Sequence, residues 1–212
     1  GGGRLEATHS FDVRIEGESA PIDPEGALAH PGGAAEVDMV VVNDQDLTYA
    51  VSRLDPHSTD VALAYAGTCP EAITRAVVWA ALWNALRDGL VDPRRFVQSA
   101  LVAVESEAEP AVRDRLLALA HSAIRDYLPG GARQGLRELL SAATIRYARE
   151  TGDADAARAF TRAFITEFEA YGPGAFTELV RGYAAGDDID LAWRARCALA
   201  ARGLVDADRI TA

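Results

Sequence analysis

His121 is the side chain best suited by type to move a proton at neutral pH. An unperturbed imidazole titrates close to neutrality, so it can act as a general base without a special environment. The apolar residues between Val112 and Ile124 recur at helical spacing and leave His121 on the polar side of that helix. A lone histidine on a polar face is also an ordinary surface residue, and the sequence leaves both interpretations open.

Glu105 and Glu107 are the other candidates for catalysis, because two further carboxylates, Glu109 and Asp114, lie close to them in the chain. Neighbouring carboxylates shift one another's pKa or bind a cation. Acidic residues are also favourable at the start of a helix, and Glu109 directly precedes Pro110. The cluster therefore indicates either an acid–base site or the solvated beginning of a helix.

Trp83 and Arg87 lie one helical turn apart and are candidates for substrate binding, together with Trp79, Asn84 and Asp88 nearby. Aromatic faces attract cations, and arginine binds carboxylates, so the set suits a small amine or an amino-acid-like ligand. The surrounding residues are apolar nearly all the way round the helix. Packing of the tryptophans in the core is therefore the alternative.

Motifs for metal, nucleophilic or nucleotide chemistry are absent from the sequence. The H-E-x-x-H zinc motif needs two histidines one helical turn apart with a glutamate after the first. There is no G-x-S-x-G, no cysteine beside a plausible base and no glycine-rich phosphate loop. We expect no metal site and no cofactor. Each of the four histidines is followed by serine or proline, in the pairs His9-Ser10, His30-Pro31, His57-Ser58 and His121-Ser122.

Charge and composition exclude several classes of partner. The net charge is −11, and all 21 basic residues are arginine, scattered among 32 acidic ones, so a nucleic-acid partner is not expected. No apolar run reaches the roughly 18 residues that a membrane span needs, and the first residues do not resemble a signal sequence. Cys69 and Cys197 lie far apart in the chain, which favours reduced thiols and a cytoplasmic location.

The elements that position these residues begin with strands. Phe11, Val13 and Ile15 alternate with polar residues, and a turn centred on Gly17 follows. Residues 23–36 are rich in proline and glycine and indicate a loop. A second apolar strand is expected over 37–42, and a third over 47–51, which ends before Asp55-Pro56. The polar residues 43–46 between them suit a turn, although the two aspartates can also bind a cation.

Helices account for the rest of the chain, from about residue 58. Capping residues and Pro or Gly stops divide it at intervals of about 20 residues, which predicts antiparallel helix pairs stacked as an α-solenoid. We therefore expect a mostly α protein with a small N-terminal sheet. Residues 1–57 would form part of a β-sandwich and a junction, and residues 58–212 a helical repeat domain. The expected helices cover about 71–89, 93–108, 110–128, 132–150, 154–170, 175–184 and 189–202.

Three blocks of the sequence resemble the gluzincin zinc aminopeptidases, the aminopeptidase N family. Residues 41–55, VVNDQDLTYAVSRLD, are similar to the junction between that family's β-sandwich and its C-terminal helical domain. Residues 73–89 resemble the first long helix of that domain, and residues 188–210 resemble a later one. The resemblance implies the C-terminal part of such a protein without its catalytic domain, and therefore without the zinc site.

Tyr49 and Arg53 become substrate-binding candidates through this resemblance. In the family, the concave wall of the helical domain faces the substrate chamber, and both residues lie where the sheet meets the helices. The alternative for Arg53 is an ion pair between the domains, with Asp55 close by.

The resemblance implies an accessory module that shapes a binding site completed by another chain or domain. Compared with the family, the sheet would have unpaired edges and the solenoid would stop early, so we expect a second protein chain to cover both places. Two alternatives remain. One is a subunit of a heteromeric biosynthetic enzyme that acts on a small amino-acid-like substrate. The other is a protein-interaction scaffold.

Overall fold

The computed structural model describes residues 11–15, 18–22, 39–47, 51–171 and 176–205. The chain divides into two compact units, residues 1–112 and 113–212, with the boundary inside one helix. Each unit has its own helices and its own buried apolar residues.

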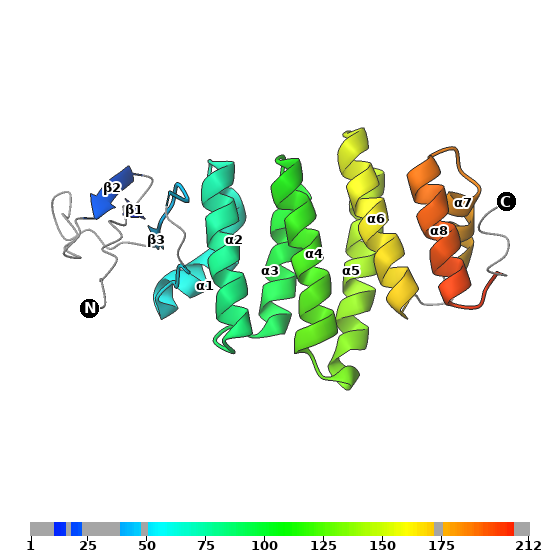
Figure 1. Cartoon of the computed structure of the whole chain (residues 1–212), viewed down its shortest axis with the longest axis horizontal. Helices are drawn as coiled ribbons and strands as arrows, with labels where there is room; N and C mark the ends of the chain where they lie inside the picture. The colour runs from blue at the N-terminus through cyan, green and yellow to red at the C-terminus, as the bar shows by residue number, and fades with distance from the viewer. Residues whose placement is uncertain (1–10, 16–17, 23–38, 48–50, 172–175, 206–212) are drawn as a thin grey trace, which may run out of the picture. The chain divides into compact units, whose positions relative to one another are not determined.

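The first unit begins with a small antiparallel sheet. Its strands are β1 (Phe11–Ile15), β2 (Glu18–Ile22) and β3 (Val40–Val42), in the order β2-β1-β3 (Figure 1). β1 and β2 pair from Phe11 opposite Ile22 to Ile15 opposite Glu18. The alternating residues before Gly17 therefore form a strand that pairs with the segment immediately after it.

A tight turn follows β3 at the predicted position. The backbone N–H of Asp46 donates to the carbonyl of Asn43 at 2.9 Å, and both residues have left-handed φ angles, 53° and 59°. Asparagine and aspartate tolerate this conformation better than most residues. The buried carboxylate of Asp44 accepts hydrogen bonds from Thr74 Oγ1 at 2.5 Å and from Gln45 Nε2 at 2.9 Å. The turn is thereby attached to the helices that follow it.

The strand expected over 47–51 is not formed by its described residues. Leu47 and Val51 are outside any strand and are 63% and 69% exposed. Alternation of apolar and polar residues stabilises a strand only when a neighbouring strand and a core are present. Residues 48–50, which make up most of the predicted strand, lie outside the described residues, so the strand itself stays a prediction.

The helices of the first unit are α1 (Pro56–Tyr65), the 3-10 turn η1 (Ala66–Thr68), α2 (Ala72–Arg87) and α3 (Pro93–Ser106). Asp55-Pro56, which the sequence suggested as the end of a strand, begins a helix: the Asp55 side chain accepts the N–H groups of His57 and Ser58 and caps α1. Asp92 caps α3 in the same way, as predicted.

Two close contacts in the first unit involve Phe96 and η1. The ring of Trp79 meets that of Phe96 edge to face, with centroids 5.7 Å apart. A Cβ added at Gly67 would lie 2.9 Å from the Cβ of Ala103, which is closer than two carbon atoms can approach. η1 and α3 can therefore come this close only because position 67 has no side chain.

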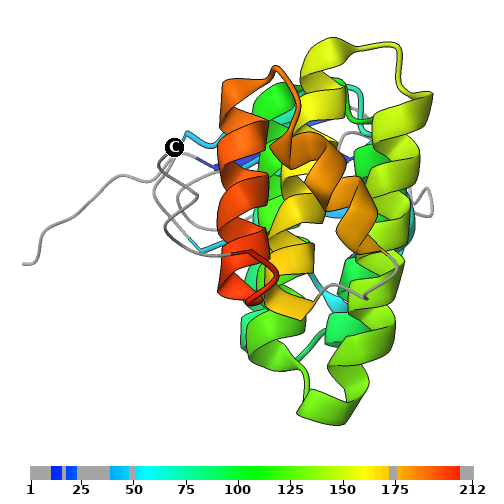
Figure 2. The ribbon, with the colours of Figure 1, turned by 90° about the vertical axis from the view of Figure 1, so that its right-hand side faces the viewer.

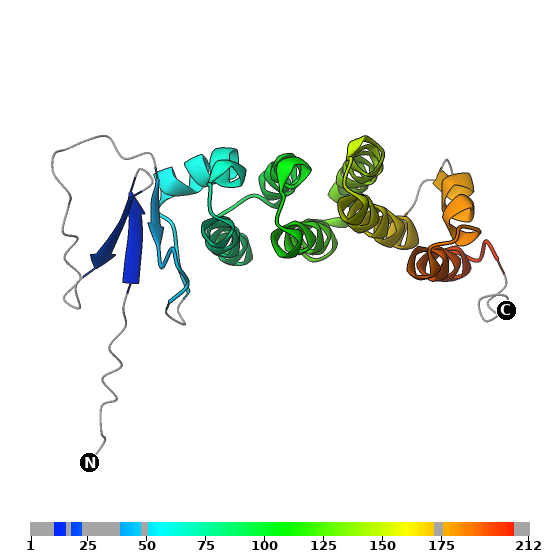
Figure 3. The ribbon, with the colours of Figure 1, turned by 90° about the horizontal axis from the view of Figure 1, so that it is seen from above.

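The second unit holds most of α4 (Pro110–Tyr127), followed by α5 (Gly130–Glu150), α6 (Ala154–Tyr171), α7 (Thr177–Ala184) and α8 (Ile189–Ala201). α5 packs along α6, and α7 packs on α8, as the end-on view of Figure 3 shows. α8 also lies against α6, with α7 running obliquely beside it (Figure 2). Asp153 and Asp188 cap α6 and α8 as predicted.

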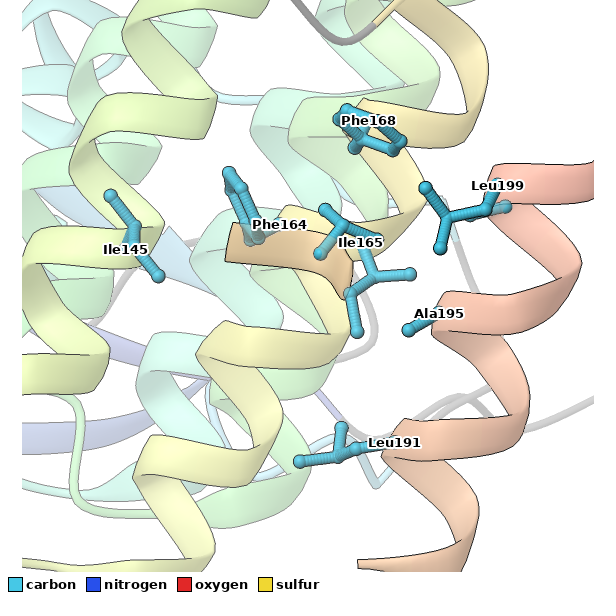
Figure 4. Packing of buried hydrophobic residues seen from close by; sticks show 9 residues of the cluster. Ile145, Phe164, Ile165, Phe168, Leu191, Ala195 and Leu199 are labelled. Carbon is cyan, nitrogen blue, oxygen red and sulfur yellow. The ribbon is translucent and has the colours of Figure 1, made fainter. Parts of the chain in front are cut away.

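The core of this unit joins α6 to α8. Leu191, Ala195 and Leu199 recur every fourth residue on α8, and they face Ile165 and Phe168 of α6 (Figure 4). The predicted class, mostly α with a small N-terminal sheet, is confirmed. The last described strand ends at Val42 and the first helix begins at Pro56, and the compact units divide after Val112.

Candidate functional site

A groove in the second unit is the best candidate for a binding site. It lies between α4 and α6, with one residue from α5, and has a volume of about 350 Å³. We call it the α4/α6 groove. Its lining consists of Asp114, Leu117, Ala118, His121, Ser122, Arg125, Leu140, Ala159, Arg162, Ala163 and Thr166.

Helical spacing and small side chains create this hollow. On α4, Asp114, Ala118, His121 and Arg125 are separated by four, three and four residues, so they follow one face of the helix. The alanines that line the groove leave space between the two helices that larger side chains would fill. The groove therefore has charged groups along its length above a mostly apolar floor.

The mouth of the groove carries an ion pair. Arg162 Nη2 lies 3.7 Å from Asp114 Oδ2, and these side chains are 41% and 53% exposed. This separation is beyond hydrogen-bonding distance. An exposed ion pair without a hydrogen bond contributes little to stability, so either partner can turn to another group.

His121 contacts a buried carboxylate, that of Glu167. Its Nδ1 contacts Glu167 Oε1, and only 1% of the Glu167 side chain is exposed. The other carboxylate oxygen, Oε2, has no hydrogen-bond partner and lies 4.0 Å from Arg137 Nε. A histidine whose Nδ1 donates to a carboxylate presents Nε2 as its acceptor, which is the arrangement of a positioned base. His121 is thus less exposed than its place on a polar helix face predicted.

Glu167, Arg137 and Arg162 were missed by the sequence analysis. A signal for Glu167 existed, because it lies between Phe164 and Phe168 on a helix whose phenylalanines face the core. A charged residue on a buried stripe is expensive to desolvate and needs a partner. The residue opposite it on α4, His121, is that partner.

Glu107 has a different environment from the one that the acidic cluster suggested. It is buried, and its two carboxylate oxygens accept from Arg75 Nε and Nη2, each at 2.6 Å. It also accepts the backbone N–H of Glu109 at 2.8 Å. This paired carboxylate raises the pKa of Arg75. Glu107 therefore holds α2 to the end of α3, whereas Glu105 is exposed.

The predicted substrate-binding residues do not line the α4/α6 groove, because they belong to the first unit. Arg53 Nη2 pairs with Asp88 Oδ2 at 2.8 Å on the surface, and not with Asp55. Trp83 is half-buried against Phe96, and Arg87 is exposed. Tyr49 lies outside the described residues.

Features for metal binding or membrane insertion are lacking in the described part of the chain. Among those residues, no group of three or more His, Cys, Asp or Glu is arranged to hold a metal ion. The described side chains therefore do not fit the three-ligand zinc site of the aminopeptidases. Within the same ranges, no helix is both long and apolar enough to cross a bilayer. Cys69 and Cys197 are both half-buried.

A short antiparallel sheet that leads through a capped turn into packed helices defines a class of helical C-terminal domains. The chain belongs to the ERAP1-like C-terminal domain family, whose model matches residues 39–212. It is also 30% identical over 166 residues to the "Aminopeptidase N" of Streptomyces lividans, which covers 77% of this chain. The chain spans only about a fifth of that relative, 19% of its length. The family predicted from the three sequence blocks is confirmed.

Proposed function

We propose that this chain is a chamber-wall module of a peptide-processing enzyme, which shapes the space around the substrate while another domain or chain supplies the reacting groups. One observation carries this proposal. The match to the ERAP1-like C-terminal domain covers all of the helical part, whereas the H-E-x-x-H motif occurs nowhere in the 212 residues.

A chimera with the relative tests this role. In the Streptomyces lividans aminopeptidase N, the segment that matches this chain would be replaced by residues 39–212, and KM and kcat would be measured for substrates of different length. A wall module contacts long substrates more than short ones. We therefore expect KM for peptides of several residues to change by roughly threefold or more, about 0.7 kcal/mol. The KM for an aminoacyl-anilide should change much less.

The unaltered enzyme and a version lacking the exchanged segment serve as controls for this experiment. A folded, zinc-loaded chimera with the same length dependence as the unaltered enzyme would contradict the proposal. So would measurable release of amino acids from an aminoacyl-anilide by this chain alone.

A second candidate function is favoured by the His121–Glu167 pair. Convergent charged groups in a hollow suit a subunit of a biosynthetic enzyme that acts on a small amino-acid-like substrate, with His121 as its base. The test is activity of a complex with the product of a neighbouring reading frame. Such activity should be lost in His121→Gln, with no change in assembly of the complex, and it should be kept in Arg115→Gln. The charged side chains that converge in this groove favour a small-molecule site over the broad surface of a protein-interaction scaffold.

A partner surface on α8 forms part of the same proposal. Ile189 and Trp193 lie one turn apart and are 87% and 56% exposed, which supports contact with a further protein. Light scattering of the chain should show self-association or binding of a co-expressed partner, reduced in Ile189→Glu. A monomer that captures no partner and is unaffected by Ile189→Glu contradicts this part. The wide separation of Cys69 and Cys197 in the chain supports our expectation of a reducing, cytoplasmic location.

A further inference from the structure

We propose that the α4/α6 groove binds a small zwitterion of dipeptide size. The ligand ammonium group would contact Asp114, its carboxylate would contact Arg162, and its apolar side chains would cover the floor. This inference does not rest on the proposed function, because it concerns binding by this chain alone. It follows from the charges at the mouth, the floor and the second ring nitrogen of His121.

The ion pair at the mouth is the first argument. The 3.7 Å separation of Asp114 and Arg162 leaves both groups without a hydrogen bond to each other, and both are about half exposed. A ligand with both charges can give each residue a charge-assisted hydrogen bond, which is stronger than the interaction it replaces. Arg75 and Glu107 already form two short hydrogen bonds with each other, so a ligand would have to break these before it could bind either residue.

The balance of charge around the groove is the second argument. Arg125 is occupied by Asp126, which accepts from its Nε and Nη2, each at 2.8 Å. The charge of Glu167 is offset by Arg137, whose Nε lies 4.0 Å from Glu167 Oε2. Asp114 and Arg162 then remain as one negative and one positive group in the lining, and both are partly exposed. A ligand that is only an anion would be repelled by Asp114, and a ligand that is only a cation would be repelled by Arg162. A zwitterion can place an opposite charge against each of them.

The floor and His121 set the size of the ligand. Leu117, Ala118, Leu140 and Ala163 offer apolar surface between the charged groups. A volume of about 350 Å³ is at the lower end for small-molecule sites, and it exceeds what one amino acid fills. His121 lines the groove with Nδ1 engaged by Glu167, so Nε2 is the ring atom that it can offer to a peptide N–H. A dipeptide has that group, whereas a free amino acid does not.

Calorimetric titration of the full chain with L-leucyl-L-leucine tests the inference. We expect saturable binding that weakens roughly tenfold or more in Asp114→Asn and in Arg162→Gln, because each removes one charged partner. Arg115→Gln is the matched control, since Arg115 is exposed on α4 and does not line the groove. Its affinity should equal that of the unaltered chain.

Chemical variants of the probe test each end of the ligand separately. N-acetyl-L-leucyl-L-leucine lacks the ammonium group, and L-leucyl-L-leucinamide lacks the carboxylate, so both should bind roughly tenfold more weakly or worse. Circular dichroism should confirm that every variant is folded. The inference is overturned if the dipeptide does not bind at millimolar concentration, or if it binds equally to all variants. Equal binding of the acetylated or amidated probe overturns it as well. None of these outcomes depends on the peptidase chimera.

Discussion

Among the described residues, each unit contains a buried glutamate that contacts a basic side chain, Glu107 in the first unit and Glu167 in the second. The two carboxylates differ in how many of their oxygens are engaged. Glu107 has both oxygens engaged by Arg75, a partner that is always charged. Glu167 has one oxygen against His121, a partner that can be neutral, and its other oxygen has no hydrogen bond. The residues of the first pair do not line the α4/α6 groove, whereas His121 of the second pair does. A pair in which both carboxylate oxygens are engaged holds helices together. A pair with an unengaged oxygen, beside a groove, can position a side chain that contacts a ligand.

Loss of the first pair should have the largest effect on stability. Glu107→Gln leaves the Arg75 guanidinium buried without its charge partner, and such a loss costs about 3 to 5 kcal/mol. Urea unfolding measures the free energy of unfolding. Glu169→Gln, on the exposed side of α6, is the control and should change it by no more than about 0.5 kcal/mol. A cost below about 1 kcal/mol for Glu107→Gln would show that the pair is not structural.

Loss of the second pair should cost less. Glu167→Gln removes a buried carboxylate of which one oxygen already lacks a hydrogen bond, and the amide oxygen of glutamine can still accept one from the His121 ring, so we expect a loss of about 1 to 3 kcal/mol. A double-mutant cycle with His121→Gln gives the coupling between the two side chains in the same unfolding assay. If Glu167→Gln destabilises the chain as much as Glu107→Gln does, the distinction between the two pairs fails.

The cap of α1 should have the smallest effect of the three. Asp55→Ala removes a side chain that accepts two backbone N–H groups, which costs about 1 kcal/mol. Asp55→Asn keeps an acceptor at the same position and should lose less. Equal losses in the two variants would show that the hydrogen bonds to the cap are not what stabilises the helix.

The contribution of this cap should also depend on pH. Hydrogen bonds from the Ser58 hydroxyl and backbone, and from His57, lower the pKa of Asp55 below its ordinary value of 3.8. Because the pKa of Asp55 is lower in the folded state, the ionised cap contributes fully to the free energy of unfolding above pH 3.8. This contribution is lost as the pH falls through the folded-state pKa. The destabilisation by Asp55→Ala should therefore be constant from about pH 7 to pH 5 and shrink below pH 3.8. A loss that grows on acidification would contradict this assignment.

Local signals made most of the helical part predictable. Asp92, Asp153 and Asp188 begin helices because a capping carboxylate acts on backbone groups within three residues. The same signal at Asp55 was assigned to the end of a strand, since the alternating residues before it suggested a sheet. A strand depends on partners elsewhere in the chain, and alternation does not reveal whether they exist.

The groove was not predictable in the same way. His121 was recognised from its chemistry, but its partner lies 46 residues later, on a helix that is not its neighbour in sequence. The candidate sites at Trp83 and Arg87 were built from residues close in the chain, which share a helix but need not share a hollow. Only the packing of α4 beside α6 brings Asp114 near Arg162.

The contact between Gly67 and Ala103 has a consequence for how this fold can change over time. A new Cβ at position 67 would lie 2.9 Å from the Ala103 Cβ and 3.1 Å from the Ala103 Cα, so an alanine at 103 changed to glycine would relieve only part of the clash. Because the nearer of the remaining atoms belongs to the backbone, we expect glycine at position 67 in related proteins that keep η1 against α3 at this distance.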